Sequence, residues 1–317
     1  MTRALAITGP TASGKTALSL HLAELTSGEI ISCDSMQIYR GMDIGTAKAT
    51  AAERARVPHH MIDFLSPREN YSVELYRTAA IECAEEIASR GKVPIFVGGT
   101  GLYIDSVMRA ASDTSPESDP EYRAALLRSV GENTDALWER LREVDPESAE
   151  KTHKNNVKRV IRALEIYDKC GIPKSTLDKE TRVSDSPVDI GMLTIDFHDR
   201  ENLYRRVDLR VDEMMREGLL SEVESLFHEG LLSGEGTAAA AIGYKELVLY
   251  LEGRATLDEA IDLIKLATRR YAKRQLTWFR HEAGAYRLFA DTECGQMRSY
   301  DELIREARAF ALEFLAR

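Results

Sequence analysis

A glycine-rich loop near the N-terminus is the strongest constraint on how this chain folds. Residues 9–16 read GPTASGKT and match the pattern G-x-x-x-x-G-K-[ST], between an apolar run at 4–8 and a segment with helical spacing. In such a strand–loop–helix unit, backbone N–H groups and the helix N-terminus bind phosphate oxygens. Lys15 adds a positive charge and Thr16 a hydroxyl group for Mg²⁺. The alternative is a glycine-rich turn that holds no ligand.

Strand and helix patterns alternate along most of the sequence. Strands are predicted at 4–8, 29–34, 93–97, 188–197 and 286–290, and helices at 16–25, 73–88, from 205 onward and at 299–315. Strands that alternate with helices indicate a parallel sheet covered by helices. We therefore predict an α/β fold: a P-loop NTPase-like parallel sheet flanked by helices.

The composition changes at Asp113. There the sequence DTSPESDPEY opens a charged, helical stretch without strand patterns that extends to Pro187. We predict that 113–187 is an inserted small all-helical domain, and that 1–112 and 188–317 together form the P-loop core.

Composition excludes several classes of protein. With 44% hydrophobic and 30% charged residues, the chain resembles neither a disordered acidic protein nor a membrane protein. The N-terminus lacks a signal-peptide pattern, so we expect a cytoplasmic location. The four cysteines lie far apart without a CxxC pair, which predicts neither a zinc site nor a disulfide framework.

The net charge of −10 argues at first sight against a nucleic-acid partner, but this charge is unevenly distributed. Residues 151–174 contain seven basic and two acidic side chains, and residues 265–280 contain six basic and no acidic ones. These two segments carry +11 and the rest of the chain −21. Cationic strips on an acidic protein favour contact with a phosphate backbone. A solvated helix face is the alternative for either segment.

Two aspartates are candidates for a role beside the phosphate loop. P-loop proteins commonly hold Mg²⁺ with the help of an aspartate on a neighbouring strand, and both Asp34 and Asp196 follow predicted strands. Asp34 is favoured because it opens a polar, glycine-punctuated loop at 34–48, where open α/β sheets place ligand-facing residues. A turn-forming or helix-capping aspartate is the alternative.

Motifs spread over nearly the whole chain resemble the tRNA dimethylallyltransferase (isopentenyltransferase) family. They occur in this order: GPTASGKT (9–16), DSMQIYRGMDIGTAK (34–48), PHHMID (58–63), YSVELY (71–76), VGGTGLY (97–103), RALE (162–165), AIGYKE (241–246) and RRYAKRQLTWFR (269–280). The second motif and AKRQLTWFR are the most specific. The resemblance implies a bacterial, Mg²⁺-dependent enzyme that transfers a dimethylallyl group from dimethylallyl diphosphate to tRNA. The acceptor is the exocyclic amine of the adenine on the 3′ side of the anticodon, in tRNAs that read codons beginning with U.

The resemblance also implies roles for individual residues. Asp34 is expected to be the general base, while Lys15, Thr16 and Arg210 hold the diphosphate and Thr16 contacts Mg²⁺. Further diphosphate contacts are expected from Gly9, Pro10, Thr11, Ala12, Ser13 and Gly14. Contacts with the anticodon stem-loop are expected from Asp34, Ser35, Met36, Gln37, Thr100, Arg123, Lys158, Arg159, Val160, Ile161, Arg162, Ala240, Ala241, Ile242, Gly243, Tyr244 and Lys245. We expect no membrane partner and a monomer.

Three glycines in VGGTGLY are open to two interpretations. Gly98, Gly99 and Gly101 would let backbone approach closely, near the expected RNA contact at Thr100. A structural strand–helix turn is the alternative.

Three other functions compete with tRNA prenylation. One is a related isopentenyltransferase that uses a free adenine nucleotide, although such an enzyme would have little use for the 113–187 insertion and two basic strips. The others are an ordinary P-loop kinase and a non-catalytic RNA-binding P-loop protein.

Overall fold

The computed structural model describes residues 2–108, 116, 119–131, 133–183, 186–232 and 236–317. It divides into two compact units: residues 1–108 with 187–317, and residues 109–186. The sequence had predicted the insertion at 113–187. Half of the predicted linker that opens it, 113–115 with 117–118, lies outside the described residues.

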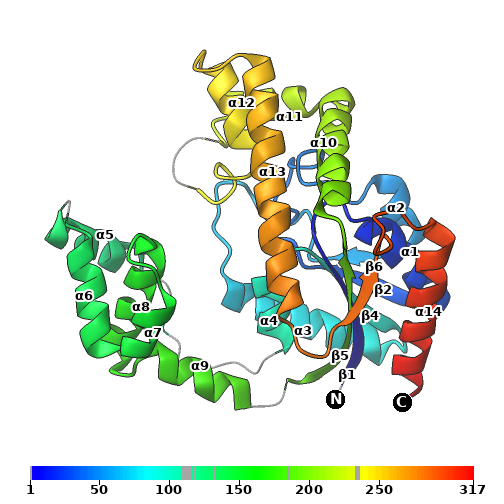
Figure 1. Ribbon diagram of the computed structural model, residues 1–317, viewed down its shortest axis with the longest axis horizontal. Coiled ribbons are helices and arrows are strands. Elements are labelled where there is room, and N and C mark those ends of the chain that lie inside the picture. The colour runs from blue at the N-terminus through cyan, green and yellow to red at the C-terminus, as the bar shows by residue number, and fades with distance from the viewer. Residues whose placement is uncertain (1, 109–115, 117–118, 132, 184–185, 233–235) are drawn as a thin grey trace. The chain divides into compact units, whose positions relative to one another are not determined.

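The larger unit is built on one six-stranded sheet (Figure 1). Every strand pairs in parallel with its neighbours, in the order β3-β2-β4-β1-β5-β6. The strands are β1 (Thr2–Thr8), β2 (Gly28–Ser32), β3 (His59–His60), β4 (Val93–Gly98), β5 (Val188–Asp196) and β6 (Tyr286–Phe289). Because β4 lies between β1 and β2, the segments that follow these three strands meet at one edge of the sheet.

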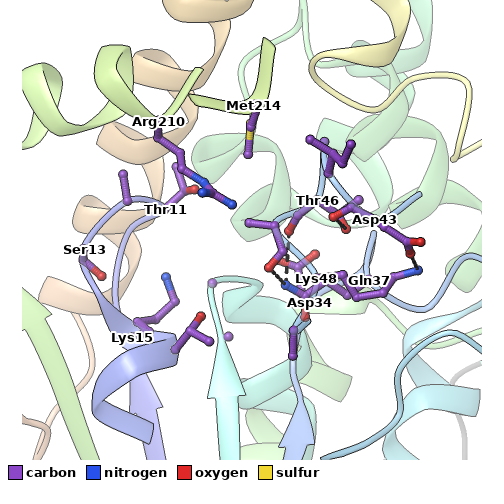
Figure 2. A pocket seen from close by; sticks show the side chains of 18 of the residues that line it. Thr11, Ser13, Lys15, Asp34, Gln37, Asp43, Thr46, Lys48, Arg210 and Met214 are labelled. Carbon is purple, nitrogen blue, oxygen red and sulfur yellow. Dashed lines mark hydrogen bonds and ion pairs between the residues drawn. The ribbon is translucent and has the colours of Figure 1, made fainter. Parts of the chain in front are cut away.

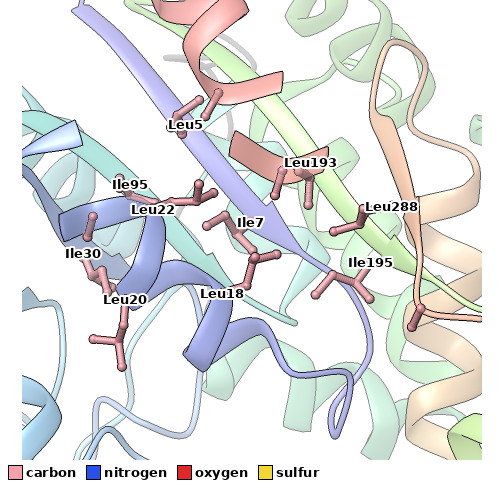
Figure 3. Packing of buried hydrophobic residues seen from close by; sticks show 14 of the residues in the cluster. Leu5, Ile7, Leu18, Leu20, Leu22, Ile30, Ile95, Leu193, Ile195 and Leu288 are labelled. Carbon is pink, nitrogen blue, oxygen red and sulfur yellow. The ribbon is translucent and has the colours of Figure 1, made fainter. Parts of the chain in front are cut away.

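Helices cover both faces of this sheet. On one face, α1 (Lys15–Thr26) and α14 (Tyr300–Ala316) pack against each other and against the central strands. Their apolar side chains meet Ile7 and Ile195 in the cluster shown in Figure 3. On the opposite face, α3 (Val73–Ser89) and α4 (Gly101–Met108) bury Tyr76 and Tyr103 as a stacked ring pair. The strands are therefore buried on both sides, as parallel strands require.

A second group of helices packs over the loop that follows β2. It consists of α10 (Arg200–Glu217), α11 (Leu219–His228), α12 (Tyr244–Leu251) and α13 (Leu257–Arg280), of which α10 and α13 run side by side (Figure 1). Their apolar side chains form one cluster with Ile38, Tyr39 and Met42 of the loop. The short helix α2 (Ala51–Arg56) follows this loop, and a capping box between Thr50 and Glu53 caps its N-terminus.

The smaller unit is helical throughout its described residues. Its helices are α5 (Pro120–Val130), α6 (Asp135–Val144), α7 (Pro146–Lys151), α8 (Val157–Cys170) and α9 (Lys174–Val183). A separate apolar cluster forms where Leu137 and Leu141 of α6 meet Val160, Ile161 and Leu164 of α8. The unit thus has a hydrophobic core of its own.

The predicted α/β fold is confirmed. All five predicted strands are present with small shifts at their ends, and so are the helices predicted at 16–25, 73–88 and 299–315. The sequence analysis missed β3 and α2, which are two and six residues long and too short for a periodic pattern. Among the described helices, none combines the length and apolar composition needed to cross a lipid bilayer.

The three glycines after β4 serve the close packing of this edge. A Cβ atom on Gly98 would lie 2.1 Å from the carbonyl oxygen of Cys33, at the end of β2. A Cβ atom on Gly99 would lie 2.1 Å from the Gln275 amide, and one on Gly101 would lie 2.4 Å from the Trp278 ring. The groups that approach these glycines closely belong to the protein itself: the backbone at Cys33 and side chains of α13. The structural alternative for these glycines therefore holds.

We predict that Gly98→Ala destabilises the protein by about 1–3 kcal/mol, because the added methyl group meets backbone that cannot rotate away. Urea unfolding measures the change. Gly236→Ala is the matched control, since a Cβ atom at Gly236 would meet no atom of the described residues within 4 Å. Equal midpoints for the two variants would contradict the packing argument.

Candidate active site

The phosphate loop lies between β1 and α1. Gly14 has φ 96°, a left-handed conformation that side chains disfavour, and it caps the N-terminus of α1. The Lys15 ammonium donates a 2.7 Å hydrogen bond to the carbonyl of Pro10 across the loop. The Ser13 hydroxyl is buried and has no hydrogen-bond partner within the described residues. Such an unpaired polar atom is costly in the free protein and is suited to a ligand oxygen.

The loop after β2 brings Asp34 to the same edge of the sheet. An Asp34 carboxylate oxygen accepts the N–H of Met36 at 2.9 Å, which fixes the start of the loop. From the end of β4, the Thr100 hydroxyl accepts the N–H of Ser35 at 3.1 Å. The Gln37 amide lies in the same loop and donates to the carbonyls of residues 46 and 47, at 3.1 and 3.2 Å. Asp34, Ser35, Gln37 and Thr100 are thus brought together.

Two arginines of α10 face the phosphate loop. Arg206 donates to the carbonyl of Ala12 at 2.7 Å, and burial lowers the pKa of its guanidinium. Arg210 lies one turn further along the helix and makes a loose 3.7 Å contact with Glu213. In Figure 2 the Arg210 side chain extends from α10 toward the space above Lys15. The sequence analysis assigned the diphosphate to Arg210, and Arg206 is the additional cation that already touches the loop.

These groups line one cavity of about 880 Å³. Its wall combines the loop 11–16, Asp34, Gln37 and 43–51 with polar and apolar side chains of α10 and α13. Figure 2 shows Lys15 and Asp34 on separate elements that border this space. A cavity with cations at one end and a carboxylate nearby is suited to a ligand that carries an anionic group.

Burial shifts the pKa values of Lys15 and Asp34 in opposite directions. It lowers the pKa of Lys15 to about 8, against the opposing effect of the Asp34 carboxylate. It raises the pKa of Asp34, against the N–H groups of Met36 and Gln37 and the charge of Lys15. Both side chains keep some surface open to the cavity, but protein atoms surround them on most sides. Each group is therefore closer to neutrality than it would be in water.

Asp196, the other candidate aspartate, lies elsewhere. Its carboxylate is 1% exposed and pairs with Arg280, whose guanidinium donates to it at 2.7–3.1 Å. It does not line the cavity. Its role is to join β5 to the end of α13, so Asp34 is the aspartate beside the phosphate loop.

The sequence analysis missed Gln275. Its side chain is 5% exposed, accepts the N–H of Thr11 at 2.9 Å and donates to the carbonyl of Gly99 at 2.9 Å. It therefore ties the phosphate loop to the turn after β4. A signal was present, because Gln275 is a polar residue within the buried stripe of α13 that includes Ala272, Leu276 and Phe279.

The expected tRNA contacts of the larger unit differ in exposure. In the segment 240–245, Ala240 and Lys245 are exposed and Ile242 is half-buried. Ala241, Gly243 and Tyr244 are buried, and Tyr244 has 0% exposed surface. The side chains of this segment that a large ligand can reach in the free protein are therefore those of Ala240, Ile242 and Lys245.

Most cations of the segment 151–174 are engaged within the protein. Arg123 and Arg162 both pair with the fully buried carboxylate of Glu165, at 2.7 and 2.8 Å. Four lysines of the segment also pair with acidic side chains: Lys151, Lys154, Lys169 and Lys174. Lys158 and Arg159 are exposed and make no ion pair with another described residue.

Two of the other residues expected to touch RNA here are core residues. Val160 is 1% and Ile161 is 3% exposed, and both belong to the apolar cluster of the helical unit. Arg162, also expected to contact RNA, donates hydrogen bonds to Glu165 and to the carbonyl of Pro116, at 2.8 and 2.9 Å, and is therefore engaged within the protein. Of the α8 side chains that were expected to contact RNA, Lys158 and Arg159 are therefore the ones that are exposed and not paired with a described residue.

The basic strip of α13 divides in the same way. Lys265 and Arg269 pair with Asp212 and Asp208 of α10, at 2.6 Å each, and so join the two helices. Three exposed cations of the strip make no ion pair with a described residue: Arg270, Lys273 and Arg274. These three share one side of the helix. The Arg274 guanidinium also lies over the Tyr271 ring, 5.6 Å from its centroid.

Comparison with known proteins shows the family to which the chain belongs. A family model described as IPP transferase matches residues 37–282, and one described as isopentenyl transferase matches residues 2–62. The chain belongs to the IPP transferase family. It is 48% identical over 277 residues to the tRNA dimethylallyltransferase of Carboxydothermus hydrogenoformans, an alignment that covers 87% of this chain and 88% of that protein.

Solved structures agree with this membership. The tRNA isopentenylpyrophosphate transferase of Bacillus halodurans superimposes with a TM-score of 0.73 at 41% identity, covering 100% of this chain and 97% of that one. A eukaryotic dimethylallyltransferase acting on tRNA gives a TM-score of 0.83 at 30% identity, covering 100% of this chain and 80% of that one. The predicted family is therefore confirmed.

We predict that pyrophosphate binds this family member more weakly as the pH rises through about 8, the pKa of Lys15 in the free protein. The sign follows because the anion needs the charged ammonium, which is lost above that pKa. Calorimetric titration from about pH 7 to about pH 9.5 measures the ratio of the wild-type affinity for pyrophosphate to that of Lys15→Met. This affinity advantage should fall by up to about tenfold per pH unit. The Lys15→Met variant corrects for titration of the ligand itself. An advantage that does not change with pH would contradict the shifted pKa.

Proposed function

We propose that this protein is a tRNA dimethylallyltransferase. It transfers the dimethylallyl group of dimethylallyl diphosphate to the exocyclic amine of the adenine on the 3′ side of the anticodon, in tRNAs that read codons beginning with U. One observation carries the proposal: Lys15, Arg210 and Asp34 border a single cavity in a chain that matches this family along most of its length.

The cationic end of the cavity supports binding of the leaving group. When the carbon–oxygen bond of the allylic diphosphate breaks, negative charge gathers on the departing diphosphate and positive charge on the allylic carbon. The loop N–H groups, Lys15 and Arg210 are suited to stabilise that negative charge, because burial makes electrostatic interactions stronger than they are in bulk water. Arg206 holds the loop itself through the Ala12 carbonyl.

Asp34 supports the acceptor half of the reaction. The lone pair of the adenine amine is conjugated with the ring, so the amine is a weak nucleophile that gains from a base. As the amine nitrogen bonds to the allylic carbon, Asp34 takes the proton that the nitrogen releases. The raised pKa of Asp34 makes its carboxylate a stronger base than an exposed one. The target base must leave its stack to reach this depth.

The residues present fit a bound Mg²⁺ ion. Thr16 lines the cavity at the first turn of α1, and the Ser13 hydroxyl, also in the cavity lining, lacks a partner within the described residues. Mg²⁺ takes few oxygen ligands from protein and binds mainly through phosphate oxygens and water. When bound through Thr16 and the diphosphate, the ion would help to neutralise the charge of the leaving group.

RNA binding is assigned to the cations that remain free. Lys158 and Arg159 on α8, and Arg270, Lys273 and Arg274 on α13, are exposed and lack ion pairs to described residues. They are positioned to contact phosphates, whereas the paired cations of the same segments maintain the fold.

One assay separates this function from its rivals. The protein is incubated with dimethylallyl diphosphate, Mg²⁺ and either an anticodon stem-loop RNA or AMP. Prenylated RNA supports the proposal, and product on AMP alone would replace it with a free-nucleotide isopentenyltransferase. Consumption of ATP without prenylation would support a kinase. RNA binding without any transfer would support a non-catalytic RNA-binding protein.

We predict that Asp34→Asn lowers kcat by about 10²- to 10⁴-fold, because the amide cannot accept the proton. Stem-loop affinity should change little, since the side chain keeps its size and can still accept the Met36 N–H. Single-turnover transfer and a filter-binding assay measure the two effects. A variant that transfers at near the native rate would remove Asp34 from the chemistry.

We also predict that changing Lys158 and Arg159 together to Ala weakens stem-loop binding and reduces its salt dependence. The slope of log affinity against log salt should fall by about 0.7 to 0.9 for each phosphate that the variant no longer neutralises. Lys154→Ala is the matched control on the same segment, because Lys154 is paired with Asp135 at 2.6 Å. An unchanged slope in the double variant would remove α8 from the RNA interface.

A further inference from the structure

A carboxylate of α11 accepts hydrogen bonds from the backbone of the loop after β2. One oxygen of Glu222 accepts the N–H groups of Asp43 and Ile44, at 2.9 and 2.8 Å. Its other oxygen accepts the N–H of Gly45 at 3.1 Å and the hydroxyl of Tyr244 at 2.5 Å. Three successive N–H groups that converge on one anion form a concavity of the kind that binds phosphate. Here the anion is supplied by the protein.

Tyr244 and Gly45 fit this arrangement closely. The Tyr244 ring is completely buried, and a Cβ atom on Gly45 would lie 2.5 Å from it. Burial, together with the charge of Glu222, raises the pKa of Tyr244, so its hydroxyl remains a hydrogen-bond donor. The Tyr244 side chain is therefore committed to Glu222 in the free protein.

The held backbone leads directly to Gln37. Residues 43–48 line the cavity, and the carbonyls of Thr46 and Ala47 accept both hydrogen bonds from the Gln37 amide nitrogen. The Gln37 amide oxygen accepts from the Ser32 hydroxyl at 3.0 Å. Lys48, at the end of the segment, is 7% exposed and donates to the carbonyl of Tyr39 at 2.7 Å. The orientation of Gln37 thus depends on where the 43–47 backbone lies.

We propose that Glu222, supported by Tyr244, is a positioning residue that sets the acceptor-base side of the cavity through the 43–47 backbone and Gln37. Among the described residues, Glu222 is outside the cavity wall and makes no hydrogen bond to the phosphate loop. Its effect should therefore fall on the RNA substrate and not on the diphosphate substrate. This inference rests on the proposed function for its kinetic part, while its structural part can be tested without any substrate.

The structural test is amide hydrogen exchange of wild-type protein and Glu222→Gln without ligands. The glutamine keeps one acceptor oxygen but directs an NH₂ group at backbone donors and loses the charge that strengthens these hydrogen bonds. Amides 43–45 should exchange about tenfold faster in the variant, with exchange in α1 unchanged. Glu224→Gln is the matched control, because Glu224 lies on the same helix while the carboxylate that holds these amides belongs to Glu222.

The kinetic test measures KM for each substrate separately. Glu222→Gln should lower kcat/KM for the stem-loop by about 10- to 100-fold, through a higher KM, a lower kcat or both. The reason is that small misplacements of substrate-orienting groups are costly. KM for dimethylallyl diphosphate should stay within about twofold of the wild-type value. Tyr244→Phe should act in the same direction with a smaller effect. In the double variant, Tyr244→Phe should add less to the effect of Glu222→Gln than it causes alone, because the two residues share one contact.

Each outcome has a distinct meaning. Unchanged exchange at 43–45 would overturn the inference, and so would faster exchange with unchanged kinetics for RNA. An equal rise in KM for both substrates would reduce Glu222 to a general stability role and also overturn it. If Glu222→Gln does not fold, Tyr244→Phe provides the same comparison. If wild type and Glu222→Gln show the expected exchange difference but the wild-type protein transfers no dimethylallyl group, the proposed function is overturned while the structural role of Glu222 is supported.

Discussion

The site depends on one constraint, the parallel pairing that places β4 between β1 and β2. Because the three strands run in the same direction, the segments that follow them open at one edge of the sheet. Lys15 follows β1, Asp34 follows β2 and Thr100 follows β4. The turn after β4 must then fit between its neighbours, which is why Gly98 lies against the backbone of Cys33. Side chains far apart in sequence meet here because the sheet brings their backbones together.

The helices α10 and α13 complete the wall of the cavity, and charge pairing determines which of their cations remain available. Asp208 and Asp212 of α10 neutralise Arg269 and Lys265 of α13, which fixes the distance between the helices. The helical unit uses Glu165 in the same way for two arginines. A count of basic residues along the sequence therefore overstates the cationic surface. What remains is a small number of cations on α8 and α13 without an ion pair to a described residue, which is compatible with a net charge of −10.

The sequence predicted those parts of the site that are written in local patterns. The phosphate loop, Asp34 and Thr100 each follow a strand, and a strand followed by a polar or glycine-rich loop can be recognised within ten to twenty residues. The family motifs extended this prediction to the whole chain. By contrast, Gln275 and Glu222 accept hydrogen bonds from backbone N–H groups that lie up to 264 and 179 positions away in the sequence, and no local pattern predicts these contacts. Contacts of that kind depend on tertiary packing, so the sequence did not disclose them.

The same limit applies to Arg162, which the family resemblance implied as an RNA contact. Its guanidinium is instead held by Glu165, three residues away, and by a carbonyl before α5. A fully buried carboxylate needs paired donors, and a flexible guanidinium can turn toward it at little cost.

Lys15 and Asp34 connect the fold to the chemistry. Both are desolvated by burial, and each shifts the pKa of the other back toward the value that favours its charged form. An incoming diphosphate changes this balance, because its negative charge favours the ammonium of Lys15 and disfavours the carboxylate of Asp34. Donor binding should therefore raise both pKa values together. The leaving group would gain a fully charged cation while Asp34 becomes a stronger base, so the ground state of the free protein prepares both halves of the proposed transfer.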